Sequence, residues 1–205
     1  MATKKTDQNT EEIIMDAAKE IFQQKGMDGT RMQEIADKAG INKAMLHYYY
    51  RSKDLLFEAV FNKAFALLAP RISKILNDET LTIEEKIRDF TYNYTSFISK
   101  HPYIPDFVFH EMSRNPGFLD KIRKAKGFPS LEIFNRQVAE EVEKGVLKPI
   151  DGDQLFINLL SLNLFPFIAS PLIKGILRAD DKDFKQLIEL RKTAAADFII
   201  SAIKK

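Results

Sequence analysis

Apolar residues recur every three to four positions along nearly the whole chain, and this pattern constrains the fold more than any other feature. Such spacing places the apolar side chains on one face of an α-helix. The first stripe begins at Ile13 and the last ends at Ile203. The sequence has no alternating strand pattern flanked by hairpin turns and no internal repeat. We therefore predict an all-α fold of about nine helices.

Glycines, prolines and capping side chains divide this pattern into short and long elements. Three short helices are expected between residues 10 and 50, with ends at Gly26 and Gly40 and a cap at Asn42. The residues of 30–33 and 82–85 have the form of capping boxes. Longer or later helices are expected at 55–76, 83–100, 104–114, 118–124, 130–144, 153–177 (bent near Pro166 or Pro171) and 184–203.

Three short helices joined by tight turns and followed by long helices indicate a helix-turn-helix domain on a larger helical body. We place the first domain at residues 1–53 and a ligand-binding and dimerisation domain at 54–205. Ile35, Ala36, Leu46 and Tyr50 can form a small core that fixes the second and third helices at a steep angle.

The remaining side chains of the third helix then point outward, with Lys53 at the start of the next helix. Lysines there can neutralise phosphates, phenol and imidazole groups can donate to phosphate oxygens, and ring edges can contact thymine methyl groups. Residues 30–53 hold five basic and two acidic side chains, whereas the whole chain has a net charge of +2. The three rings His47, Tyr48 and Tyr49 could instead be a packed cluster under a loop, but so short a helix cannot bury three consecutive residues.

The run from Ile35 to Leu56 resembles the DNA-binding segment of the TetR family of transcriptional regulators, and the resemblance is specific from Asn9 to Leu56. It implies a homodimer with a second helix-turn-helix one half-site away, and a pocket whose small ligand releases the operator. By position, Thr30 would hold a phosphate, residues 43–49 would form the recognition surface and Lys53 would clamp the DNA backbone. The predicted DNA-contacting residues are Thr30, Arg31, Gln33, Lys43, Ala44, Met45, His47, Tyr48, Tyr49 and Lys53.

Two of these positions depart from the family pattern. Family members often carry Tyr where this chain has His47, and some carry Arg where it has Gln33. An operator sequence therefore cannot be transferred from the family.

The larger domain is rich in phenylalanine, with 16 in the chain and no tryptophan. Most phenylalanines pack in cores, but cavities lined by aromatic side chains and a few polar groups are the usual sites for small ligands. Polar residues inside apolar helical stretches need a buried partner or a ligand. The candidate ligand residues are Tyr94, Phe97, Phe107, His110, Phe134, Phe156, Asn158 and Asn163, and the expected effector is apolar or aromatic.

The last two helices carry apolar residues on more than one side, which favours burial against a second copy of the chain. The expected arrangement is a four-helix interface about a two-fold axis. The predicted interface residues are Leu162, Phe165, Leu187, Leu190, Ala194 and Phe198. The alternative is a helix that lies fully buried inside a monomer.

Several classes of function are excluded by absent residues or motifs. The chain has no cysteine, which removes disulfides and cysteine metal sites. His101, His110 and Glu111 do not have the spacing of a helical ligand pair, and neither a nucleophile elbow nor a glycine-rich phosphate loop is present. We therefore expect no metal, no cofactor and no enzymatic activity.

Membrane and secretory roles are disfavoured as well. Polar residues and prolines interrupt the apolar stretch 155–177, which is unsuited to the interior of a bilayer. The N-terminus through Glu12 is polar, so we expect no signal peptide and a cytoplasmic protein.

These features predict a ligand-responsive transcriptional regulator, a repressor that reads a pseudo-palindromic operator in double-stranded DNA. The alternative is an all-α small-molecule binding or carrier protein whose N-terminal basic patch binds a protein partner. That alternative predicts no salt-sensitive binding to duplex DNA.

Overall fold

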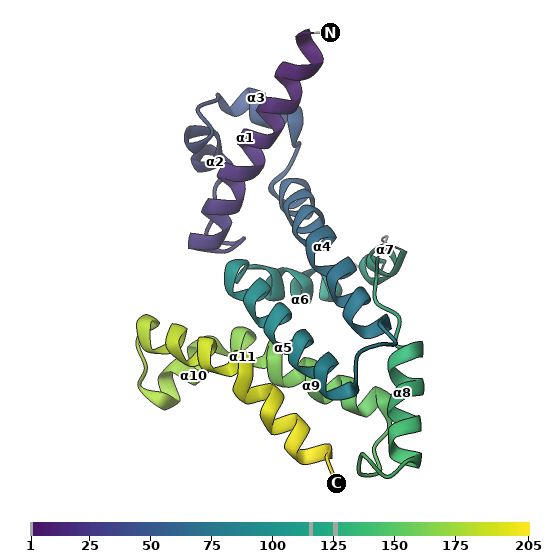
Figure 1. Ribbon diagram of the computed structural model, residues 1–205. Helices are drawn as coiled ribbons and strands as arrows, with labels where there is room; N and C mark the ends of the chain where they lie inside the picture. Colours follow the sequence, from purple (N-terminus) through teal and green to yellow (C-terminus); the bar gives the residue numbers. More distant parts are fainter. Residues whose placement is uncertain (1, 115–116, 125–126) are drawn as a thin grey trace. The chain divides into compact units, whose positions relative to one another are not determined.

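The computed structural model describes residues 2–114, 117–124 and 127–205, and these residues form eleven helices and no strand. The all-α prediction is confirmed, with more helices than the nine or so expected. The elements are α1 (Ala2–Lys25), α2 (Met32–Lys38), α3 (Lys43–Tyr49), α4 (Lys53–Asn77), α5 (Ile83–Lys100), α6 (Ile104–Arg114), α7 (Phe118–Lys124), α8 (Glu132–Glu143), α9 (Gly152–Ile168), α10 (Ser170–Leu177) and α11 (Asp181–Ile203) (Figure 1).

The chain divides into two compact units, Met1–Ala66 and Leu67–Lys205, and the division falls inside α4. The first unit has its own core, in which the rings of Phe22 on α1 and Phe57 on α4 lie 4.4 Å apart. Ile35 of α2 and Leu46 of α3 are fully buried. The functional boundary at residue 53 stays a prediction.

Capping side chains begin the helices of the first unit. Asn42 Oδ1 accepts a hydrogen bond from the Met45 N–H at 2.7 Å, and Ser52 Oγ accepts one from the Leu55 N–H at 3.2 Å. The predicted capping box at Thr30 is wrong, because α2 begins at Met32 and its N-cap residue is Arg31. The reason is that the Thr30 hydroxyl donates to the Gly26 carbonyl at 2.6 Å and so stabilises the preceding turn.

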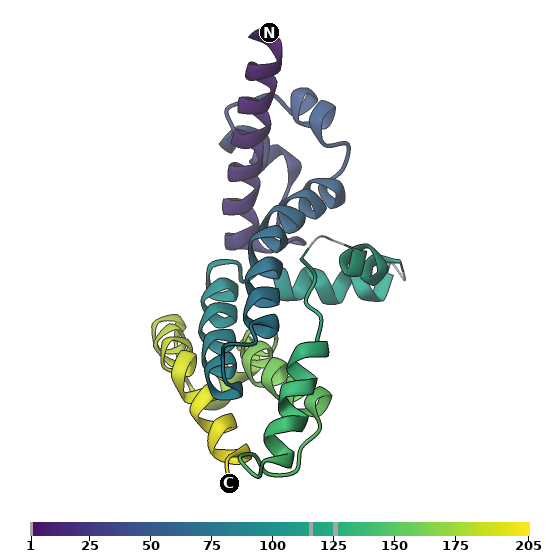
Figure 2. The same ribbon diagram turned by 45° about the vertical axis from the view of Figure 1, so that its right-hand side comes forward.

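In the second unit, α5 packs against both α9 and α11, and α8 packs against α9 (Figure 2). The Thr82 capping box at the start of α5 is present as predicted. The apolar stripe of α5, which includes Ile83, Ile87 and Phe90, is buried in the core that these helices share. A single amphipathic helix thus organises the larger unit.

The predicted bend in the long apolar helix is present as a complete break. The helix ends at Ile168, a new one begins at Ser170, and the chain direction changes by 75° between them. Pro171 lies in the first turn of α10, where its missing N–H costs no hydrogen bond. Taken singly, no described helix is both long and apolar enough to cross a membrane, and α9 with α10 reaches that composition only across the bend.

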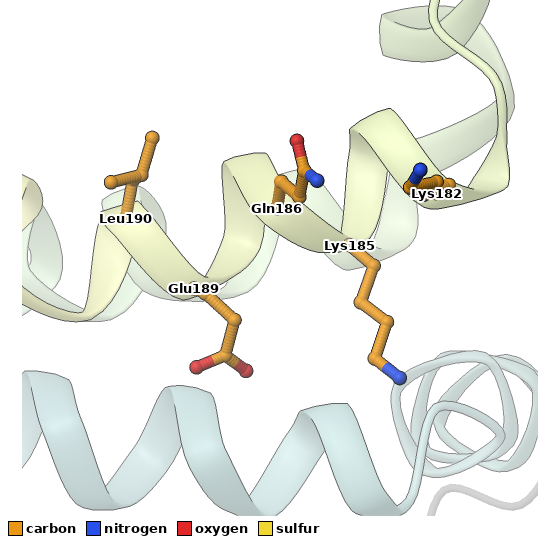
Figure 3. Close-up of a pocket in the computed structure, with 5 residues that line it drawn as sticks. All are labelled: Lys182, Lys185, Gln186, Glu189 and Leu190. Carbon is orange, nitrogen blue, oxygen red and sulfur yellow. The ribbon is translucent and has the colours of Figure 1, made fainter.

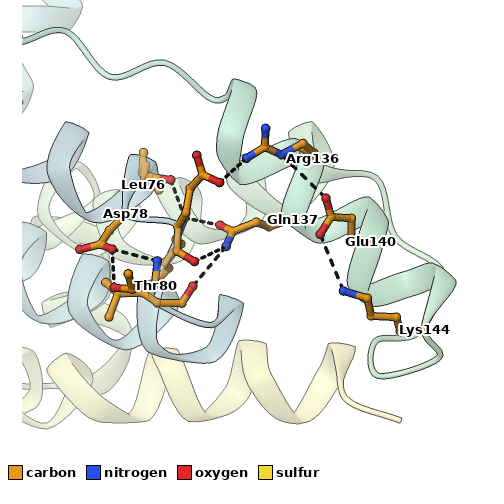
Figure 4. Close-up of polar contacts among 10 residues, drawn as sticks. Leu76, Asp78, Thr80, Arg136, Gln137, Glu140 and Lys144 are labelled. Carbon is orange, nitrogen blue, oxygen red and sulfur yellow. Dashed lines mark hydrogen bonds and ion pairs between the residues drawn. The ribbon is translucent and has the colours of Figure 1, made fainter.

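A polar network fixes the end of α4 to α8 (Figure 4). The ammonium group of Lys86 is buried and donates to the Leu76 carbonyl at 2.7 Å and to Gln137 Oε1. The Gln137 amide donates in turn to the carbonyls of Glu79 and Leu81. Desolvation lowers the pKa of Lys86. Its hydrogen bond to the Leu76 carbonyl makes this lysine a buried donor to the last turn of α4.

Candidate functional site

The third helix is fixed to the first unit through one side. Leu46 is fully buried, and the Tyr50 hydroxyl donates to Glu11 Oε1 on α1 at 3.0 Å. Burial, followed by the neighbouring carboxylate, raises the pKa of Tyr50 well above its usual value. The turn before α3 places Gly40 at φ +67° and closes with a hydrogen bond from the Ile41 N–H to the Ala36 carbonyl at 3.0 Å. Helix α3 therefore has a defined orientation within this unit.

The opposite side of α3 faces solvent. Tyr48 is 82% exposed, a large value for an aromatic side chain, and its ring meets the Tyr49 ring edge-on at 5.5 Å. His47 is exposed and its Nδ1 lies 3.3 Å from the Arg51 carbonyl, whereas Tyr49 is half-buried. Lys43, Ala44 and Met45 are also exposed. The exposure of Tyr48 contradicts a cluster sealed under a loop.

Ion pairs with α1 reduce the positive charge away from α3. Lys38 pairs with Glu20 at 2.7 Å, and Lys25 pairs with Glu34 at 2.8 Å. Of the five cations in the segment 30–53, four remain after Lys38 is paired, and three of them, Lys43, Arg51 and Lys53, lie on α3 or directly after it in the sequence. The basic character of the segment is therefore concentrated beside the exposed rings.

The predicted contacts before α3 divide into buried and exposed groups. Thr30 is only 2% exposed and its hydroxyl proton is used by Gly26, so in this state it offers no hydroxyl donor to a phosphate. Its carbonyl accepts from Lys53 Nζ at 3.2 Å, which ties the start of α4 to the turn before α2. Arg31 and Gln33 are exposed, and the Gln33 amide donates to Asp37 at 2.7 Å.

Three of the predicted ligand residues, Tyr94, Phe134 and Phe156, lie close together in the core of the second unit. Phe134 and Phe107 are buried in apolar packing. Tyr94 and Phe156 pack around Phe90, and burial raises the pKa of Tyr94.

The polar candidates behave differently from one another. Asn163 is buried, but Thr91, Thr95 and the Leu159 carbonyl satisfy it. Asn158 and His110 are exposed, so neither needs a buried partner, and their contact with a ligand stays a prediction. The helices that carry them are apolar on several sides, so the sequence pattern does not indicate which side faces solvent.

Among the predicted ligand residues, Phe97 lines a cavity. This cavity has a volume of about 610 Å³, and α4, α5 and α11 contribute its walls. Sequence reasoning missed its charged members Arg71, Lys100 and Lys192. No local signal could have found them, since they lie on three separate helices.

A second depression, of about 640 Å³, lies along α11 (Figure 3). Its lining side chains point in different directions: Gln186 and Leu190 extend from one side of the helix, whereas Lys185 and Glu189 extend from the other. They cannot enclose one small molecule together, so this depression is a poor ligand site.

Large apolar side chains on the last helices face solvent. Phe165 of α9 is 56% exposed, and Leu190 and Phe198 of α11 are 71% and 64% exposed. Ala194 is exposed, and Leu162 and Leu187 are half-buried. These exposures exclude a fully buried α11 in the single chain. The predictions missed Leu172 and Ile176 of α10, which are exposed as well.

The described residues contain no group of three His, Asp or Glu side chains that could hold a metal ion. His101 is buried beside Phe97, and its Nδ1 lies 3.2 Å from the Tyr103 hydroxyl, whereas His110 is exposed.

Comparison with known proteins places this arrangement among regulators. Residues 14–60 match the family described as "Bacterial regulatory proteins, tetR family". The "Probable HTH-type transcriptional regulator YttP" of Bacillus subtilis (strain 168) is 22% identical over 170 residues, which cover 82% of each chain. RutR, an HTH-type transcriptional regulator of Escherichia coli (strain K12), is 43% identical over 58 residues, 28% of this chain and 27% of RutR.

Solved structures extend the likeness over the whole chain. The crystal structure of HlyIIR, a hemolysin II transcriptional regulator, has 26% sequence identity and a TM-score of 0.63, and the match covers 97% of this chain and 98% of HlyIIR. The relatives named here are transcriptional regulators and not enzymes, in agreement with the prediction of a protein without catalytic activity.

Proposed function

Since this chain belongs to the TetR family of bacterial regulatory proteins and is a DNA-binding transcriptional regulator, we propose that it is a repressor whose operator complex is released by a small apolar or aromatic molecule. The operator is pseudo-palindromic and the active form is a homodimer. Its place of action is the bacterial cytoplasm, where the operator lies.

The outward face of α3 is the observation that carries this proposal. An 82% exposed tyrosine beside the exposed Lys43 is unfavourable for a surface that meets only water. The same groups suit a DNA major groove, where cations meet phosphates while ring edges and Met45 meet base edges and thymine methyl groups. Since α3 is oriented by Leu46 and Tyr50, the groups enter the groove as one rigid surface.

The exposed apolar side chains of α9 and α11 support the homodimer. A two-fold axis brings the same patch of each copy together, so Phe165, Leu190 and Phe198 can be buried by their counterparts. Two recognition helices in a dimer read half-sites about 34 Å apart, one turn of the duplex. A pseudo-palindromic operator follows from that symmetry.

The cavity beside α5 supports an effector. Leu67, Leu68 and Phe97 give it an apolar surface, and its volume of about 610 Å³ lies in the range of small-ligand sites. The effector releases DNA only if it binds more tightly to a conformer whose half-site spacing does not fit the operator.

Sequencing of genomic fragments retained by the purified protein tests the proposal and supplies the operator. Gel-shift titrations then compare the native chain with Tyr48→Ala and with Phe128→Ala, a control at an exposed aromatic side chain of the second unit. We expect Tyr48→Ala to lose discrimination between operator and random duplex while Phe128→Ala retains it. Equal discrimination in all three proteins would refute the assignment of α3 as the recognition surface.

The carrier-protein alternative makes the opposite prediction for salt. A protein-binding basic patch gives no operator enrichment and no steep loss of duplex binding as salt rises, whereas phosphate contacts produce both. Transcription from the recovered operator in a purified system tests repression, because a repressor lowers the transcript level when it is added.

A further inference from the structure

The cavity of about 610 Å³ in the second unit has a charge pattern that the proposed effector must match. Arg71 comes from α4, Lys100 from α5 and Lys192 from α11, and no aspartate or glutamate is among the lining residues. Three cations around one small volume create a positive potential that attracts anions.

A carboxylate that does not line the cavity neutralises part of this positive charge. Lys192 Nζ lies 2.6 Å from Glu189 Oε2 and 5.7 Å from the centre of the Tyr92 ring. Arg71, in contrast, is exposed and forms no ion pair with the residues that the structure describes. Its guanidinium group can bind a carboxylate or a phosphate through two parallel hydrogen bonds.

A buried hydroxyl in the same wall also indicates a polar ligand. Ser96 Oγ is inaccessible to solvent and has no hydrogen-bond partner within the described part of the chain. Buried polar atoms are almost always paired in folded proteins, so a buried hydroxyl without a partner in a cavity wall calls for a group that pairs with it. Ser96 lies on α5, one helical turn from Lys100.

The rest of the wall is mixed: Tyr92, Asn93 and His101 carry polar atoms, whereas three side chains are apolar. Leu67 and Leu68 of α4 and Phe97 of α5 contribute side chains that gain from contact with an apolar body. The cavity thus combines cations, one unsatisfied hydroxyl and an apolar surface.

We propose that this cavity binds a small amphiphilic anion, whose carboxylate or phosphate group meets Arg71 and Lys100 while its apolar body covers Leu67 and Phe97. Rotation of the Ser96 side chain toward the cavity lets its hydroxyl donate a hydrogen bond to the same anionic group. The inference rests on the proposed function in one respect: the anion is taken to be the effector.

Calorimetric titration of the purified, DNA-free protein tests the binding step. The probes are 2-naphthoate, decanoate and 2-naphthyl phosphate, with 2-naphthamide and decanamide as uncharged controls of nearly the same shape. We expect at least one anion to bind at least about tenfold more tightly than its matched amide, since charge-assisted hydrogen bonds are stronger than neutral ones. Comparison of the naphthoate with the phosphate identifies the preferred head group.

Two variants locate the charge. Arg71→Gln is expected to weaken anion binding about tenfold, whereas Lys74→Gln, which removes a cation from the same helix outside the cavity, leaves it unchanged. Ser96→Ala is expected to raise the melting temperature of the free protein, because it removes a buried hydroxyl that has no partner. The same substitution is expected to weaken anion binding, so stability rises while affinity falls. The proposal is overturned if no anion binds, if the amides bind as tightly as the anions, or if Arg71→Gln behaves like Lys74→Gln.

Release of a labelled operator is measured separately. An anion that binds in an Arg71-dependent way without releasing DNA supports the cavity inference and refutes the effector role. A compound that releases DNA equally well from the native protein and from Arg71→Gln supports the effector role and refutes this cavity as the anion site.

Discussion

Lys43 provides the most direct quantitative test of the DNA interface. It is the first residue of α3, it is exposed, and it forms no ion pair with any described residue. In a homodimer the substitution Lys43→Gln therefore removes two cations from the recognition surface, without breaking a side-chain contact that holds the fold.

The expected magnitude follows from counterion release. The slope of log K against log salt changes by about 0.9 for each neutralised phosphate, so two lost contacts make it shallower by about 1.8. When salt rises from about 50 to about 200 mM, the ratio of native to variant affinity should fall about 12-fold. The variant is thus most defective at low salt.

Fluorescence anisotropy with a labelled operator at several salt concentrations measures both slopes. Lys63→Gln is the matched control, because Lys63 is an exposed lysine on α4 in the same unit. If Lys43→Gln alters the slope no more than Lys63→Gln does, Lys43 makes no phosphate contact, and the orientation assigned to α3 on the DNA is wrong.

Three further perturbations test packing, titration and assembly. Asn163→Ala should lower the free energy of unfolding by about 2–4 kcal/mol, or the melting temperature by roughly 5–10 °C, because Thr95 and Thr91 lose their hydrogen-bond partner. Thermal unfolding followed by circular dichroism measures the effect, and the control Asn158→Ala, at an exposed position of α9, should change the free energy of unfolding by less than about 0.5 kcal/mol. Burial raises the pKa of Tyr103 to about 12, so between pH 10 and 12 the folded chain keeps a proton that the unfolded chain releases. The free energy of unfolding should therefore fall as pH rises through this range, and denaturant titrations of Tyr103→Phe should show a smaller decline. Phe198→Glu should produce a monomer in analytical ultracentrifugation whereas Phe128→Glu should not, and a dimeric Phe198→Glu protein would contradict the interface assigned to α11.

Local rules predicted the first unit well. Asn42 was expected to cap a short helix because its oxygen can reach an N–H three residues on, and the bond to Met45 confirms it. The exposure of Tyr48 followed from a length argument: a helix of two turns with one buried side has no second apolar environment for a neighbouring ring. Both inferences use only residues close together in the sequence.

The second unit was harder to predict because α9 is apolar on nearly all sides. Asn158 and Asn163 appeared equivalent in the sequence, but a step of five positions turns the direction of the side chain around the helix axis by about 140°. One amide therefore faces solvent while the other meets Thr91 and Thr95 of α5. Likewise, Arg71 and Lys100 are nearly 30 positions apart in the sequence, and only the packing of α4 beside α5 brings them to one cavity.

Helix α4 carries residues of both proposed binding surfaces, and release of DNA sets an energetic requirement on the proposed effector. Lys53 begins α4, and Arg71, 18 positions further along the same helix, lines the cavity. To move the protein from 99% DNA-binding to 99% released conformers, a ligand must prefer the released conformer about 10⁴-fold, or by about 5.5 kcal/mol. Apolar contacts with Phe97 that are equal in both conformers contribute nothing to that preference, however much affinity they add. The ionic contact with Arg71 is directional and lies on α4, so a shift of this helix changes its geometry, and it can supply part of the required difference.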